Sequence, residues 1–272
     1  MTPNGLKTAW GEGRAVVNGW LSIASPFAAE VMAAQGYDSL TVDLQHGIVD
    51  YAQGVTMLQA MRASGVTPMA RVPWLDPGII MKMLDAGAYG IICPMINSRA
   101  EAEQLVAAMR YPPRGSRSFG PTRAVVAAGS DYPRKADDEV LAFAMIETAE
   151  GVANLEEIVA TPGLDGVYIG PADLTLGVAQ GRLAPGFDRE EPEMIEVIQR
   201  IRTTAHAAGI KAALHCGSPD YAAKAVGWGF DLVTLLNDVR LLAAAAKQSV
   251  ARTRELLGQA ASAADTGDSR SY

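Results

Sequence analysis

The sequence predicts one domain built as a (β/α)₈ barrel, a closed ring of parallel strands with helices outside. First, short apolar runs alternate with longer amphipathic runs eight times along the 272 residues. Second, hydrophobic residues make up 49% of the chain but aromatic residues only 6%, and this bias toward aliphatic side chains suits a parallel sheet buried on both faces. Third, neither GxGxxG nor a P-loop follows the first strand, so a doubly wound open sheet is the weaker alternative.

The candidate strands are rich in aliphatic residues and each is five to eight residues long. A doubly wound sheet has fewer strands than this, whereas a closed barrel uses all of them. The expected strands are Ala15–Ser22, Ser39–Leu44, Thr67–Val72, Gly90–Pro94, Leu141–Glu147, Gly166–Gly170, Lys211–His215 and Leu232–Leu236.

Helical patterns fill the intervals between these strands. Apolar residues recur at helical spacing from Ile80 to Leu84 and from Met194 to Ala205. Pro192 follows acidic residues at an expected helix start, where proline's missing N–H costs little. We therefore assign residues 1–260 to the barrel and residues 261–272 to a flexible tail.

Two stretches exceed the usual length of a connection, residues 110–136 and residues 177–190. Both are rich in Gly, Pro and Arg. Long connections in compact domains are often functional. Because they follow the fourth and sixth strands, we expect both at the catalytic end of the barrel.

Composition excludes several classes of protein. The formal net charge is −7 and no basic run is present, so we expect no nucleic-acid partner. No apolar run is long enough to span a membrane, and the first residues lack the apolar stretch of a signal peptide. Cys93 and Cys216 fit neither a metal-ligand spacing nor a disulfide framework. A cytoplasmic protein is the expectation.

Polar residues gather where the expected strands end. Asp43 and His46 follow the second strand, Arg71 the third, Glu147 the fifth and Asp173 the sixth. In a (β/α)₈ barrel the chemistry lies at this carboxyl-terminal rim. The pattern therefore predicts one active site that contains all five residues.

Glu147 and Asp173 are the candidate metal ligands. Two carboxylates without a Cys or His pair favour a hard divalent cation such as Mg²⁺ or Mn²⁺, with water and substrate as further ligands. The structural alternative is that each carboxylate caps a helix or pairs with an arginine.

Arg71 and His46 are the candidate catalytic side chains. Arg71 closes an apolar strand, so its guanidinium should project into the barrel mouth and offset the charge of a bound 2-oxo acid and its enolate. The alternative is a structural salt bridge with Asp43 or Asp85. His46 follows Asp43 by three residues and is a plausible general base. His215 ends the seventh strand, where it could line the pocket or pack in the core.

The segment Gly170-Pro171-Ala172-Asp173 opens a helix and offers backbone N–H groups to a substrate carboxylate. No lysine closes a strand, and Lys211 opens the seventh strand at the wrong end. An aldolase that forms an imine needs a lysine inside the site, so the Schiff-base route is not expected.

Taken together, these residues resemble the HpcH/HpaI aldolase family, the metal-dependent class II pyruvate aldolases. The resemblance runs from about Gly19 to Asp238. Its most specific pieces are VDLQHG (42–47), ARVP (70–73), LDAGAYGIICPMI (84–96), YPPRGSRSFGP (111–121), MIET (145–148) and IGPADL (169–174).

The resemblance implies a (β/α)₈ barrel assembled as a hexamer with an exchanged C-terminal helix. It also implies that Ser118–Pro121 approaches a neighbouring subunit's site. The matching positions imply roles for the site residues: Glu147 and Asp173 on the metal, Arg71 on the pyruvyl oxygen, His46 as acid/base supported by Asp43 and Asp85, the main chain of Ala172 and Asp173 on the substrate carboxylate, and Trp20 near the pocket floor.

Two positions depart from the family's pattern. Gln45 stands where relatives often carry a glutamate, and Met145 stands where some relatives carry a glutamine. Met145 removes a polar contact near the metal, which bears on substrate preference and leaves the enolate chemistry intact.

The expected reaction is reversible cleavage of a 4-hydroxy-2-oxo acid into an aldehyde and pyruvate, or hydroxypyruvate, with Mg²⁺, Mn²⁺ or Co²⁺ as cofactor. Three alternatives remain open: a citrate-lyase-β-like CoA-ester lyase, a phosphoenolpyruvate enzyme, and a non-catalytic oligomer that binds 2-oxo acids. Binding of a CoA ester, phosphate release and tight binding without turnover, respectively, would favour them.

Overall fold

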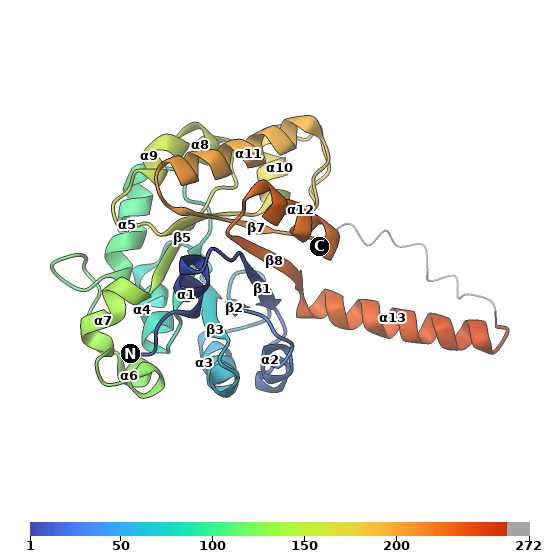
Figure 1. Cartoon of the computed structure of the whole chain (residues 1–272), viewed down its shortest axis with the longest axis horizontal. Helices are drawn as coiled ribbons and strands as arrows, with labels where there is room; N and C mark the ends of the chain where they lie inside the picture. Colours follow the sequence, from blue (N-terminus) through green and yellow to red (C-terminus); the bar gives the residue numbers. More distant parts are fainter. Residues whose placement is uncertain (260–272) are drawn as a thin grey trace.

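The computed structural model describes residues 1–259, which form a closed barrel of eight parallel strands in sequential order (Figure 1). This confirms the predicted fold class, and each strand boundary lies within two residues of its expected position. The strands are β1 (Val16–Leu21), β2 (Ser39–Asp43), β3 (Thr67–Arg71), β4 (Gly90–Cys93), β5 (Leu141–Met145), β6 (Gly166–Ile169), β7 (Lys211–His215) and β8 (Leu232–Asn237).

Helices surround the barrel, most of them returning the chain from the end of one strand to the start of the next. The helices are α1 (Gly5–Gly11), α2 (Pro26–Ala33), α3 (Tyr51–Ala60), the 3₁₀ turn η1 (Met61–Ser64), α4 (Pro77–Asp85), α5 (Arg99–Met109), α6 (Thr122–Ala128), α7 (Tyr132–Glu139), α8 (Ala149–Ala153), α9 (Leu155–Val159), α10 (Pro171–Ala179), α11 (Pro192–Ala207), α12 (Pro219–Trp228) and α13 (Asp238–Leu256).

Side chains of each strand alternate between two hydrophobic layers. In β2 and β3, Val42 and Ala70 belong to the large layer between the sheet and the helices, whereas Met69 belongs to the smaller layer inside the barrel. The period of two in a strand therefore turns Asp43 and Arg71, the last residues of these strands, toward the barrel axis. Glu147, two residues beyond Met145, follows the same alternation.

The amino-terminal end of the barrel is closed by α1. Asn4 caps this helix by accepting a hydrogen bond from the backbone N–H of Leu6. Leu6 and Ala9 are buried in the interior layer, and Trp10 packs against it. The sequence analysis predicted no helix here, because only one short apolar face distinguishes the segment.

Polar residues fill the middle of the barrel and form hydrogen bonds with one another. The Asn18 side-chain amide donates to Thr234 Oγ1 at 2.9 Å, and its carbonyl accepts from the hydroxyls of Ser39 and Thr41. Tyr168 donates to the same Thr234 oxygen at 2.7 Å. Because every member has a partner, the layer avoids the cost of burying unsatisfied polar groups.

One expectation about the long connections was wrong. Residues 110–136 follow α5, so they lie at the amino-terminal end of the barrel, opposite the catalytic rim, and they contain α6 and α7. The rule that placed them at the catalytic end holds only for a connection that follows a strand directly. The second stretch, residues 177–190, begins in α10 and does lie on the catalytic side. The predicted tail, residues 261–272, lies outside the described residues.

Both cysteines are free and fully buried in the layer between sheet and helices. Cys93 ends β4 and Cys216 follows β7. Burial raises the pKa of both thiols well above their usual range. Over residues 1–259, the helices are too short or too polar to cross a lipid bilayer.

Candidate active site

A cavity of about 430 Å³ opens at the carboxyl ends of the strands. The residues that the sequence placed at this rim converge on it from β1, β2, β3 and the start of α10. Its lining includes Trp20, Asp43, His46, Arg71, Gly170 and Asp173. A volume of this size accommodates a small metabolite.

Asp43 and Arg71 form a bidentate ion pair at the base of the cavity. The register pairs these residues across β2 and β3, so their side chains emerge next to each other. Arg71 Nε donates to Asp43 Oδ1 at 2.9 Å and Nη2 donates to Oδ2 at 2.7 Å. Burial disfavours the Asp43 carboxylate, but the hydrogen bonds and charge of Arg71 outweigh it and hold the pKa of Asp43 below its ordinary value. Of the two partners considered for Arg71, Asp43 is the one it contacts.

Trp20 fixes this pair from the side. Its indole Nε1 donates to Asp43 Oδ2 at 3.1 Å, and the Arg71 guanidinium lies 4.8 Å from the ring centroid. Stacking on an aromatic face and the bidentate contact together orient the guanidinium plane. Arg71 is therefore held rigidly at the cavity wall.

His46 lies on the turn after β2 and is exposed at the cavity mouth. Asp43 Oδ1 accepts hydrogen bonds from the backbone N–H groups of Gln45, at 3.0 Å, and His46, at 3.3 Å. Through these two main-chain hydrogen bonds, Asp43 fixes the turn that carries His46 and so positions its imidazole at the cavity.

Glu147 lies just behind the cavity wall and is 2% exposed. Its Oε1 accepts from the backbone N–H of Met95, a residue with φ of 57°. A Cβ added at Gly170 would lie 2.7 Å from Glu147 Oε2, so a side chain there would displace the carboxylate. Burial, reinforced by the charge of Asp173, raises the pKa of Glu147 to about 7, although the Met95 N–H and Arg71 oppose the shift.

Asp173 is partly exposed in the first turn of α10 and faces the same cavity. Gly170 is the N-cap of this helix without a side-chain cap, and Pro171 follows it. The N–H groups of Ala172 and Asp173 have no intrahelical acceptor, because they belong to the first turn. The helix start thus offers two donors and the positive end of a dipole to an anion.

The carboxylates of Glu147 and Asp173 fit a hard divalent cation. A cation would favour the ionised form of Glu147, which burial and Asp173 disfavour. Within residues 1–259, no group of three or more His, Cys, Asp or Glu side chains gathers for a metal ion. A cation here would therefore take no more than two ligands from such side chains of residues 1–259, with groups such as water and substrate as the others.

The cavity lining also includes His215, Phe187 and Arg240, and of these three only His215 was a candidate from the sequence. His215, at the end of β7, is partly buried, and its removal from solvent, followed by the charge of Arg71, lowers its pKa to about 3. Its ring stacks on Phe187 at 4.9 Å, and Tyr168 lies 3.1 Å from its Nδ1. Phe187 lies in the long connection of residues 177–190, and Arg240 lies in α13. Neither residue ends a strand, so the position of site residues at strand ends did not predict them.

Asp85 lies apart from this cavity. It is the last residue of α4, a helix that leads away from the rim, and it does not line the cavity. Its Oδ1 accepts from Arg117 at 2.6 Å. The other expected site residues lie at or next to the cavity, with Glu147 directly behind the cavity wall. Asp85 lies away from the cavity, at the end of α4.

Comparison with protein families finds one that matches most of the chain. The model described as "HpcH/HpaI aldolase/citrate lyase" matches residues 17–245. A solved HpcH/HpaI aldolase/citrate lyase family protein from Burkholderia cenocepacia is 30% identical with a TM-score of 0.84, over 92% of this chain and 99% of that one.

Two curated relatives are named as aldolases. A hydroxypyruvate/pyruvate aldolase of Rhizorhabdus wittichii is 45% identical over 93% of this chain and 100% of the relative. A 5-keto-4-deoxy-D-glucarate aldolase of Shigella dysenteriae is 31% identical over 90% of this chain and 95% of the relative.

Proposed function

The chain belongs to the HpcH/HpaI aldolase/citrate lyase family and is a carbon–carbon lyase of the aldolase type, and on that premise we propose that it cleaves 4-hydroxy-2-oxo acids with the help of a divalent cation. The products would be an aldehyde and pyruvate or hydroxypyruvate, by analogy with the names of its relatives. One observation carries the proposal: Arg71, the start of α10 and Asp173 line a single cavity at the strand ends, and Glu147 lies directly behind its wall.

Glu147 and Asp173 would hold the cation, with the buried Glu147 fixed by Met95 and Gly170. The cation, which we expect to be Mg²⁺, Mn²⁺ or Co²⁺, would supply Lewis-acid polarisation of the 2-oxo group. The backbone N–H groups of Ala172 and Asp173 would bind the substrate carboxylate.

Arg71 stabilises the negative charge that develops on the 2-oxo oxygen. Its orientation is fixed in advance by Asp43 and Trp20, so little reorganisation is required during the reaction. Met145 forms an apolar part of the cavity wall next to Gly170. We expect this wall to influence which substrate is preferred.

His46 is the proposed general base of cleavage. It accepts the proton of the C4 hydroxyl, the C4–O bond becomes a carbonyl and the C3–C4 bond breaks, with its electron pair passing into the enolate. Protonation of the enolate at C3 then gives pyruvate. Asp43 supports His46 through the main chain. Support from Asp85 requires a second copy of the chain, because Asp85 does not line the cavity of its own.

We further propose a homo-oligomer, a hexamer by resemblance, in which α13 packs on a neighbouring subunit. This helix projects from the barrel (Figure 1), and Asp238 at its start is its one buried residue within the described chain. Exposed apolar residues occur along it, namely Val239, Leu242, Val250 and Leu256. Such a surface is typical of one covered by another chain.

We assign the enzyme to the cytoplasm. Its two cysteines are buried free thiols, which agrees with a reducing compartment. The acidic net charge of −7 agrees with small-molecule rather than nucleic-acid partners.

The first test is deuterium exchange into the methyl group of pyruvate, followed by NMR with metal-stripped protein and with added Mg²⁺, Mn²⁺ or Co²⁺. Exchange should require a metal and should fall together with aldol cleavage in the Arg71→Ala variant, because both need the enolate. Cleavage lost with exchange intact would remove Arg71 from enolate stabilisation.

The same assay separates the alternatives. Absence of exchange with every metal would count against an aldolase that uses pyruvate. Binding of a CoA ester would then favour the citrate-lyase-β-like lyase, and phosphate release would favour a phosphoenolpyruvate enzyme. Metal-dependent binding of 2-oxo acids without turnover would favour a binding protein.

A further inference from the structure

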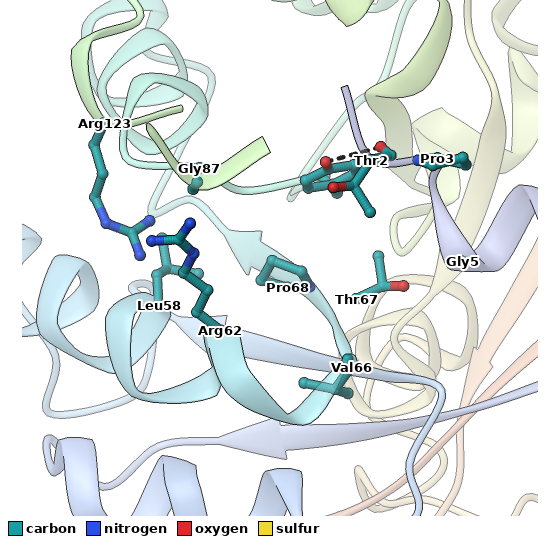
Figure 2. A pocket seen from close by; sticks show the side chains of 13 residues that line it. Thr2, Pro3, Gly5, Leu58, Arg62, Val66, Thr67, Pro68, Gly87 and Arg123 are labelled. Carbon is teal, nitrogen blue, oxygen red and sulfur yellow. Dashed lines mark hydrogen bonds between the residues drawn. The ribbon is translucent and has the colours of Figure 1, made fainter. Parts of the chain in front are cut away.

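A second cavity of about 170 Å³ lies at the opposite end of the barrel (Figure 2). It is bounded by the amino-terminal segment, by η1, by the start of β3 and by α6. Its lining includes Thr2, Leu58, Arg62, Thr67, Tyr89 and Arg123. At about 30 Å³ per water molecule, this space holds a small ion with part of its hydration shell.

Two arginines from separate elements converge on this cavity. Figure 2 shows the guanidinium groups of Arg62, from η1, and Arg123, from α6, facing each other at one side of it. Arg62 Nη2 donates to the carbonyl of Val126 at 2.9 Å, and Arg123 Nη1 donates to the carbonyl of Ala86. Each side chain is therefore held in place by one main-chain acceptor.

The charge of this pair is not balanced by the part of the chain that the structure describes. Arg62 is exposed to solvent and Arg123 is partly buried, and no carboxylate of residues 1–259 forms an ion pair with either of them. Burial, followed by the charge of Arg62, lowers the pKa of Arg123. Two like charges held together favour an anion between them.

Gly87 makes room for the Arg123 guanidinium. A Cβ at Gly87 would lie 2.7 Å from Arg123 Nη1, and the φ of +103° favours glycine independently. The turn between α4 and β4 thus accommodates the guanidinium in the space that a side chain would otherwise fill. Glycine at position 87 is therefore required for the Arg123 guanidinium to lie here.

We propose that this cavity binds a small oxyanion with two negative charges, of the phosphate class, between Arg62 and Arg123. Planar guanidinium groups contact phosphate oxygens through paired N–H donors, and two arginines match a dianion in charge. The site is separate from the catalytic cavity, with which it shares no lining residue. Occupation would link α6, η1 and the amino-terminal segment and stabilise this end of the barrel.

The test is the unfolding temperature of the full-length, metal-free protein as inorganic phosphate is added at constant ionic strength, with calorimetric titration as a second measurement. Phosphate should raise Tm in a saturable manner. The rise should be lost in Arg62→Gln and in Arg123→Gln. It should persist in Arg99→Gln, the matched removal of an exposed arginine paired with Glu103, and in Arg71→Lys at the catalytic site.

Glycerol phosphate in place of inorganic phosphate distinguishes a phosphate ester from the free ion, because only an open cavity admits the larger ligand. A further variant, Arg62→Glu, supplies a carboxylate next to Arg123 and should raise Tm without phosphate while abolishing the response to it.

Two outcomes would overturn the proposal. The first is an equal rise of Tm in wild type, Arg62→Gln and Arg123→Gln, since phosphate would then act elsewhere. The second is no response of wild type to phosphate together with a loss of oligomer mass in Arg62→Gln, since a carboxylate of a second copy would then balance the arginines.

Discussion

Arg71 illustrates what one residue can and cannot reveal from its sequence context. An arginine at the end of an apolar strand predicted a guanidinium in the barrel mouth, and the cavity lining agrees. Its partner remained open between Asp43 and Asp85, because sequence distance does not give strand register. The pairing of Asp43 with Arg71 across β2 and β3 decides it. Glu147 and Asp173 were foreseen as rim residues, whereas Phe187 and Arg240 belong to segments without strand periodicity.

Gly170→Ala should weaken metal binding while leaving the fold intact. Its φ of −95° is allowed for alanine, but the new Cβ would lie 2.7 Å from Glu147 Oε2 and force the carboxylate aside. We expect the Kd for Mn²⁺ to rise by about tenfold or more, as measured by electron paramagnetic resonance titration. Gly11→Ala, where a Cβ meets nothing within 4 Å, is the control. Unchanged Mn²⁺ affinity would mean that Glu147 does not hold the ion.

His215 should make stability fall in acid. Its pKa is about 3 in the folded protein against 6.5 as the ordinary value, so between these values the unfolded chain binds the extra proton. The stability from neutral His215 is complete above pH 6.5 and is lost as the pH falls toward 3. At pH 5 the loss should be about 2 kcal/mol, from roughly 1.4 kcal/mol per pKa unit. Urea unfolding at pH 7 and pH 5 measures it, and His215→Gln should lose less than wild type over this interval; an equal loss would contradict the assignment.

At the scale of elements, the strands were the predictable part. Each parallel strand is buried on both faces, so it appears as a nearly continuous apolar run, and all eight were found with ends shifted by no more than two residues. The misses share a cause. Three helices, α1, α6 and α7, are each seven or eight residues long, too short for a helical period to be distinguished from a loop. Because α6 and α7 were not recognised as helices, residues 110–136 were expected at the catalytic end of the barrel, whereas they lie at its amino-terminal end.

Closure of the barrel by α1 makes Leu6 a structural residue. Leu6 is fully buried in the interior layer. Leu6→Ala should lower the free energy of unfolding by about 2–5 kcal/mol, because it removes buried methyl groups and leaves a cavity. Val31→Ala, on the exposed side of α2, should change stability by no more than about 0.5 kcal/mol. Chemical denaturation compares the two, and similar small effects in both would show that α1 does not close the barrel in solution.

At the scale of the whole molecule, the count of strand–helix units predicted a closed barrel, and the hydrogen-bonded seam between β1 and β8 confirms it. Assembly could not be predicted in the same way, because it depends on surfaces rather than periodicity. The 19 residues of α13 extend about 28 Å at 1.5 Å per residue. An isolated helix of this kind is marginally stable without packing partners, which supports a covering subunit.

Removal of residues 242–272 should dissociate the homo-oligomer that we propose. This truncation retains Asp238, whose carboxylate accepts from the backbone N–H groups of Ser22 and Ile23 and ties the start of α13 to the barrel. Light scattering coupled to size exclusion should show a smaller assembly for the truncated protein and for Leu242→Ser with Leu256→Ser. Ala245→Ser, at an exposed position of the same helix, is the control. An unchanged mass after truncation would place the interface elsewhere.

The two buried cysteines can report on local opening of the barrel, because a thiol reagent reaches them only when the surrounding structure opens. A thiol reacts as its thiolate, and burial both hides Cys93 and Cys216 and keeps them protonated. A reagent can therefore modify them only when a strand and its covering helices separate. Since Cys93 ends β4 and Cys216 follows β7, three strands further round the ring, each reports on a different sector. Equal labelling rates would describe a barrel that opens as one cooperative unit, and unequal rates one whose sectors open independently.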